Sequence, residues 1–139
     1  MDFQLSFQTR HKYDARGGGL SVRTVLTTGA QIVHCVARID TGASVCLFQK
    51  ELADVLELDL ESGHLIYLST LTGSLPAFGH ELTLQTFGLA FLTTVFFAAS
   101  YGLERNLLGR TGWLQQVRLG IVDYDEEIYL SAYNDTDES

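Results

Sequence analysis

The chain has 139 residues, of which 46% are hydrophobic and only 19% are charged, a balance that excludes an intrinsically disordered protein. Its formal net charge is -8 and its nine Lys and Arg residues are scattered, which argues against a nucleic-acid partner, because phosphate binding needs clustered basic side chains. We expect one globular domain over residues 1–139, ending in a frayed polar tail over 134–139.

Hydrophobic alternation with a period of two dominates the first half of the chain and predicts β-strands. Phe3, Leu5 and Phe7, for example, alternate with polar residues. The predicted strands of this half span residues 3–8, 20–28 and 31–39. Residues 50–58 differ, because their apolar residues recur at helical spacing, which predicts a helix.

The second half of the chain also reads mainly as strands. They are predicted over residues 65–71, 75–87, 91–98, 119–122 and 128–133. A turn at Thr72-Gly73-Ser74 joins the first two of these strands, an acidic turn joins the last two, and residues 111–117 are predicted to form a short helix. The fold class predicted from these patterns is therefore all-β, with one or two short helices.

Nothing in the sequence predicts a link to a membrane. Residues 1–4 lack the basic and apolar regions of a signal peptide, and the longest apolar stretch, residues 89–99, is too short to span a bilayer. Cys35 and Cys46 are too few for a disulfide framework and lie in apolar stretches, which indicates free, buried thiols. We expect a cytoplasmic protein without a membrane partner.

The stretch of sequence most indicative of chemistry is Asp40-Thr41-Gly42, which directly follows a predicted strand. An acid at the end of a strand can point into a cleft, and a glycine beside it allows a substrate backbone to approach closely. The Gly42 N–H can also donate to the carboxylate. The alternative is a structural turn, since these residue types are typical of turns and the chain also uses Thr-Gly elsewhere without an acid.

Other kinds of chemistry have less support in the sequence. The four histidines, His11, His34, His64 and His80, show no metal-ligand spacing. There is no serine nucleophile motif, and neither cysteine lies in a catalytic context. We therefore expect neither a metal nor a cofactor.

Three elements in this order and spacing resemble the retropepsin-like aspartic peptidases, single-domain relatives of pepsin. They are I-D-T-G-A-S at residues 39–44, a glycine-tipped hairpin at 69–78 and L-L-G-R at 107–110. The resemblance extends over about residues 20–133 and is stronger to the bacterial branch than to the viral one. It implies a closed β-barrel with a flap hairpin, and an aspartic endopeptidase that acts on peptides or proteins.

The resemblance also implies a role for each matching residue. Asp40 matches the catalytic aspartate, Thr41 matches a threonine that bonds across a dimer axis, and Gly42 matches a glycine that helps to bind the substrate backbone. The rest of the active-site loop is Ala43 and Ser44, and the flap carries Thr72, Gly73 and Ser74 at its tip. The group that supports the active-site loop in the family matches Leu107, Leu108, Gly109 and Arg110.

Two positions depart from the family pattern. Viral members have an acid where this chain has Ser44, so Arg110 has either to find another acid or to stay solvated. Arg38 stands where the family has an apolar residue in the substrate groove. Because it lies two residues before Asp40 on the same predicted strand, it can line that groove. The alternative is that it turns to solvent or pairs with an acid such as Glu51.

The number of carboxylates predicts the assembly. Aspartic peptidase chemistry needs two carboxylates that share one proton, and the chain contains a single Asp-Thr-Gly. A second copy must then come from a second chain, so the resemblance implies a homodimer with one Asp40 from each subunit. The alternative is a catalytically inactive module that keeps this fold for binding or dimerisation.

Overall fold

The computed structural model describes residues 1–136, which are mostly β-strands. The strands are β1 (Thr9–Lys12), β2 (Ser21–Thr28), β3 (Gln31–Ile39), β4 (Leu47–Phe48), β5 (His64–Thr70), β6 (Gly73–Thr86), β7 (Leu89–Ala98), β8 (Asn106–Leu108), β9 (Val117–Val122) and β10 (Glu127–Ala132). Within the described residues there is one α-helix, α1 (Lys50–Val55), and there are four 3-10 turns, at Ala15–Gly17, Leu60–Ser62, Leu114–Gln116 and Asp123–Asp125. The all-β fold class predicted from the sequence is confirmed.

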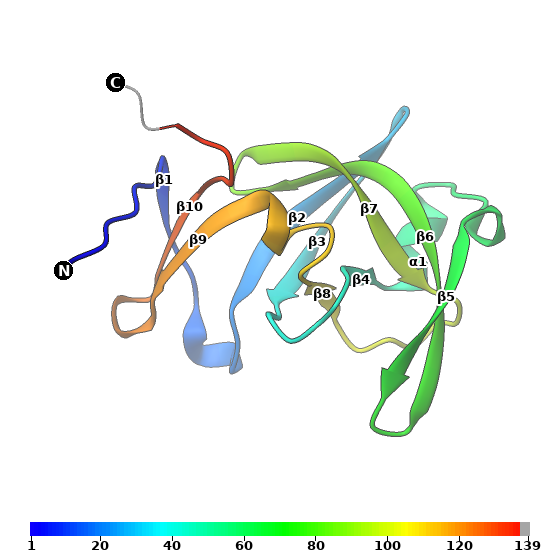
Figure 1. The fold of residues 1–139 in the computed structure, drawn as a ribbon. Coiled ribbons are helices and arrows are strands. Elements are labelled where there is room, and N and C mark those ends of the chain that lie inside the picture. Colours follow the sequence, from blue (N-terminus) through cyan, green and yellow to red (C-terminus); the bar gives the residue numbers. More distant parts are fainter. Residues whose placement is uncertain (137–139) are drawn as a thin grey trace.

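The larger sheet closes on itself to give a barrel-like ring. Its strand order is β2-β3-β8-β4-β7-β6-β5, and an additional antiparallel pairing of β2 with β6 closes the ring. Strand β5 lies outside this ring and pairs only with β6, so the two form a long hairpin that projects from the body of the protein (Figure 1).

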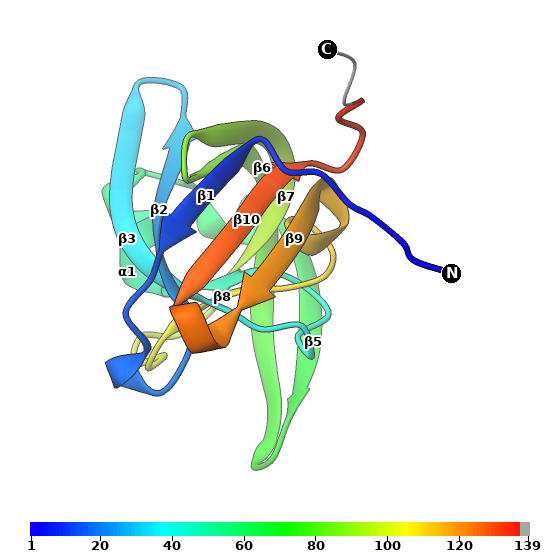
Figure 2. The same ribbon diagram turned by 90° about the vertical axis from the view of Figure 1, so that its left-hand side faces the viewer.

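The smaller sheet has the order β1-β10-β9 (Figure 2). The strand predicted over residues 3–8 is wrong, because the N-terminal strand is β1 and begins at Thr9. Alternating hydrophobic residues alone do not provide the neighbouring strand with which a β-strand has to pair. Main-chain pairing with β10 starts at Thr9, whereas the N–H of Gln8 donates to the side chain of Ser131 instead. Phe3 and Leu5 are consequently exposed.

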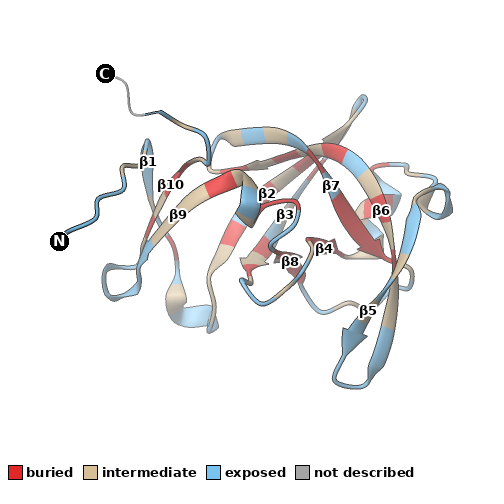
Figure 3. Cartoon of the chain, viewed as in Figure 1, coloured by how far each residue is buried: buried red, intermediate tan, exposed pale blue. Residues whose placement is uncertain are grey.

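The main hydrophobic core joins buried residues of the ring with buried residues of β9 and β10, and Figure 3 shows the buried parts of the chain in red. The largest fully buried side chains of this core are Trp113, Phe48 and Phe97, and the Trp113 indole donates a hydrogen bond of 3.0 Å to the Thr86 hydroxyl. The helix predicted over 111–117 shrinks to one 3-10 turn beside this tryptophan. Burying these three rings removes a large apolar area from water, at about 25 cal/mol per Å².

Both cysteines are free, as predicted, but only Cys46 is fully buried and Cys35 is partly so. Burial raises the pKa of the Cys46 thiol to about 12 and that of Cys35 to about 11. A thiol reacts through its thiolate, so burial disfavours the reactive form of both cysteines near neutral pH. Cys46 instead accepts a hydrogen bond of 3.4 Å from the N–H of Gly109.

The end of helix α1 differs from the prediction, and the predicted C-terminal tail extends beyond the described residues. Helix α1 was predicted to reach residue 58 but ends at Val55, because Glu57 adopts a left-handed φ of 56°. The tail predicted over 134–139 lies partly outside the described residues. Within them, Asp135 forms an ion pair of 3.2 Å with Arg118. Among residues 1–136, no helix is long and apolar enough to cross a membrane.

Candidate active site

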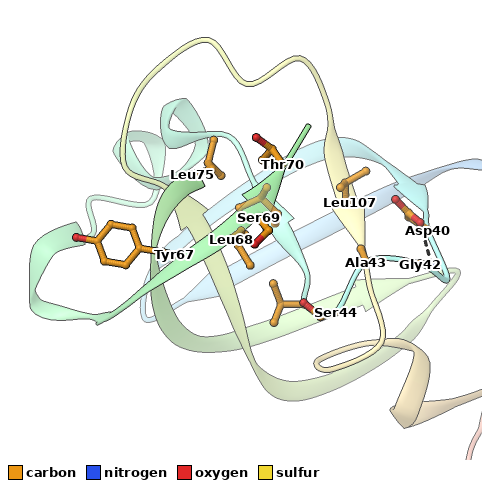
Figure 4. Close-up of a pocket in the computed structure, with 12 residues that line it drawn as sticks. Asp40, Gly42, Ala43, Ser44, Tyr67, Leu68, Ser69, Thr70, Leu75 and Leu107 are labelled. Carbon is orange, nitrogen blue, oxygen red and sulfur yellow. Dashed lines mark hydrogen bonds between the residues drawn. The ribbon is translucent and has the colours of Figure 1, made fainter. Parts of the chain in front are cut away.

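Asp40 is held at the end of β3 by strands on both sides. The N–H of Asp40 donates to the carbonyl of Leu108 at 3.0 Å, and the N–H of Ile39 donates to the carbonyl of Leu20 at 2.8 Å. The chain then turns tightly, since the N–H of Gly42 donates to the Asp40 carboxylate at 2.9 Å (Figure 4). This half-buried carboxylate therefore has a fixed direction and at least one oxygen free for a ligand.

A second segment braces the loop that follows Asp40. The N–H groups of Arg110 and Thr111 donate to the carbonyls of Ala43 and Ser44, each at 2.9 Å. Gly109 makes this approach possible, because a Cβ atom there would overlap the carbonyl oxygen of Val45. The sequence-predicted groups at 40–44 and 107–110 thus lie against each other.

Two cavities meet at Asp40. The first has a volume of about 520 Å³ and is lined mainly by the active-site loop, by β5 and by aliphatic side chains (Figure 4). The second has a volume of about 720 Å³ and continues past the hairpin tip to residues 100–105. The residues that line both cavities are Asp40, Thr70, Leu75 and Leu107. Together the two cavities form a cleft whose lining includes Asp40.

The β5–β6 hairpin forms one wall of this cleft. Its pairing runs from His64–Gly79 to Thr70–Gly73, and its turn is formed by Leu71 and Thr72. The tip was predicted at Thr72-Gly73-Ser74, and the turn lies slightly earlier because Gly73 and Ser74 already belong to β6 and pair with β5. The Leu71 side chain is fully exposed at the tip.

Comparison with solved structures finds this architecture in aspartic peptidases. A retropepsin-like aspartic protease from Rickettsia conorii matches 89% of this chain and 99% of its own, with a TM-score of 0.64 and 19% sequence identity. EIAV protease complexed with an inhibitor matches 66% of this chain and 82% of its own, with a TM-score of 0.52 and 16% identity. The chain has the retropepsin-like fold. No protein-family model and no curated protein sequence matches it.

In this retropepsin-like chain, two of the predicted site residues point to solvent. Thr41 and Arg110 are both exposed. Within residues 1–136, the Thr41 hydroxyl forms no hydrogen bond and the Arg110 guanidinium forms no ion pair. Both groups are therefore available for contacts with another molecule.

Arg38 lies away from both cavities. Its guanidinium packs against Gly19 and lies 3.5 Å from the carbonyl oxygen of Gly17, and Arg38 is absent from the lining of either cavity at Asp40. It forms no ion pair with Glu51 in the described part of the chain. A groove role for Arg38 stays a prediction.

Sequence reasoning missed the far wall of the second cavity. This wall is residues 100–105, which connect β7 to β8. The segment S-Y-G-L-E-R has no periodicity or motif that marks it as part of a site. Among residues 1–136, no group of His, Cys, Asp and Glu side chains is arranged to hold a metal ion.

Proposed function

We propose that the protein is an aspartic endopeptidase whose active site contains two Asp40 residues, one from each subunit of a homodimer. The observation that carries this proposal is the single Asp40 carboxylate, held by the N–H of Gly42 where two cavities meet beneath a projecting hairpin. One subunit supplies half of the pair of carboxylates that the chemistry needs.

The pair would act by general acid and base catalysis. One carboxylate takes a proton from a water molecule, and the protonated partner donates a hydrogen bond to the carbonyl oxygen of the scissile bond. The water attacks the carbonyl carbon while the proton of the partner passes to the carbonyl oxygen, which gives a tetrahedral diol. The C–N bond then breaks, the carboxyl that took the water proton gives it to the leaving amine, and one diol hydroxyl returns a proton to the other carboxylate. The backbone N–H of Gly42 keeps the Asp40 carboxylate oriented throughout.

The alternative is an inactive module that keeps the fold for binding. Digestion of a mixed peptide library across pH separates the two functions, with Asp40→Asn as the background. We expect a bell-shaped rate profile, because the pair works only while it shares one proton. A wild-type protein that cleaves nothing at any pH would support the binding module, and a rate that rises steadily into alkaline pH would contradict the shared-proton mechanism.

A dimeric site predicts that activity depends on protein concentration. Diluting the protein below the dissociation constant of the dimer should lower the activity per chain, because monomers contain a single Asp40. Sedimentation velocity at the same concentrations should show the dimer disappearing in parallel. A monomer that retains full cleavage activity would refute the two-chain site.

The hairpin is expected to act as a lid over the cleft. Gly73 has a φ of 140°, which only glycine adopts readily, and open space surrounds the position of a Cβ atom there. Gly73→Val should therefore reshape the exposed tip and lower kcat strongly with a small loss of stability.

The matched control for this lid is Gly29→Val. Gly29 also has a positive φ, 55°, and open surroundings, but it lies in the β2–β3 turn away from the cleft. Steady-state kinetics and thermal melting of both variants give the comparison. Equal effects on kcat would show that the hairpin is no lid.

A further inference from the structure

The two cavities at Asp40 differ in charge. Apart from Asp40 itself, the residues lining the first cavity carry no charged side chain, and most are aliphatic or small. The second cavity is lined by Glu104 and Arg105. A peptide that crosses the cleft thus meets formal charge on the side of residues 100–105.

Both charged residues line the second cavity, and Arg105 is the one that lies two residues before Leu107. Leu107 lines both cavities, whereas Asn106 turns the other way and donates to the carbonyl of Val36 at 3.0 Å. In an extended chain, side chains alternate between two faces, so Arg105 shares the face of Leu107, and Glu104 reaches the same cavity from the preceding position. Arg105 forms no ion pair within residues 1–136.

Helix α1 and the residue before it fix the position of this wall. The side-chain amide of Gln49 donates to the carbonyl of Leu103 at 2.8 Å, and the Tyr101 hydroxyl donates to the Asp54 carboxylate at 2.6 Å. The ammonium of Lys50 lies 4.6 Å from the centre of the Tyr101 ring, which adds a cation–π contact. A wall held at Tyr101 and Leu103 keeps Arg105 beside the cleft without ordering a loop each time a peptide binds.

We propose that Arg105 is a specificity-determining residue that binds an acidic side chain of the substrate close to the cleaved bond, an inference that rests on the proposed peptidase function. A guanidinium offers planar, paired N–H donors that match a carboxylate. The net charge of -8 repels acidic peptides at a distance, but salt screens that repulsion far more than it screens a contact inside a cleft.

Matched peptides with Glu, Gln or Leu, placed next to the cleaved bond or one residue beyond it, test this proposal. At one of these positions the wild type should prefer Glu over Gln by about two- to fivefold in kcat/KM, the range of a partly exposed charge pair. Arg105→Met should abolish the preference while retaining cleavage of the Leu peptide. Arg105→Lys should keep part of it, and Arg105→Glu should reverse it.

The control variant is Arg23→Met, which removes the same charge from an exposed position that lines neither cavity at Asp40. A Glu preference that survives Arg105→Met, or that Arg23→Met removes equally, overturns the proposal. Fluorescence anisotropy of the same peptides with the Asp40→Asn variant, with and without Arg105→Met, needs no turnover. A Glu preference in binding that depends on Arg105 therefore supports the role of Arg105 even if the wild type cleaves nothing, whereas its absence overturns that role.

Discussion

Asp40→Asn is expected to lower peptide cleavage by at least about a thousandfold, the scale on which a general acid–base group contributes to catalysis. The amide cannot take up the proton that a working pair must share. Its oxygen can still accept the hydrogen bond from Gly42, and Asp40 is only half-buried, so the fold should persist. Cleavage rates measure the loss of activity, and circular dichroism with thermal melting shows whether the fold persists.

Mixed dimers turn this loss into a test of the two-chain site. If wild-type and Asp40→Asn chains are refolded together in equal amounts, random pairing leaves about one quarter of the dimers with two aspartates. The mixture should then show about half the activity that its wild-type chains would show if the same amount of them were refolded alone. Undiminished activity would mean that each chain works by itself.

The sequence was sufficient to predict where the chain places the parts of the candidate site that belong to long strands or directly follow one. Alternating apolar residues predicted β3 with its observed bounds, and thereby placed Asp40 at a strand end. The hairpin was predicted to within about two residues at each strand end, because a glycine turn separates two alternating runs.

The missed parts depend on contacts that are distant in sequence. Strands β4 and β8 have two and three residues, too few to show a period, and they form only because neighbouring strands supply partners. The wall at residues 100–105 is fixed by α1, which lies about fifty residues earlier. Neither the short strands nor the wall has a pattern in its own residues that predicts it, because contacts with distant parts of the chain determine both.

Gly109→Ala is expected to destabilise the protein and displace the active-site loop together. A Cβ atom at Gly109 would overlap the carbonyl oxygen of Val45 and lie 2.8 Å from that of Ala43. A backbone carbonyl cannot rotate away as a side chain can, so the loop that follows Asp40 must move. This movement weakens the main-chain hydrogen bonds that brace the loop. The cost should be about 2–3 kcal/mol, as for other overpacked buried sites.

The loop that has to move carries the carbonyls of Ala43 and Ser44, three residues or so beyond Asp40, so kcat should fall even in the molecules that stay folded. Gly120→Ala is the control, because a Cβ atom there would meet only side chains, with the nearest atom at the end of the Phe7 ring, 3.0 Å away. Denaturant unfolding and steady-state kinetics of both variants measure the two effects. Because the Phe7 ring can shift, Gly120→Ala should cost little, and an equal loss in the two variants would mean that Gly109 has no special part in holding the Asp40 loop.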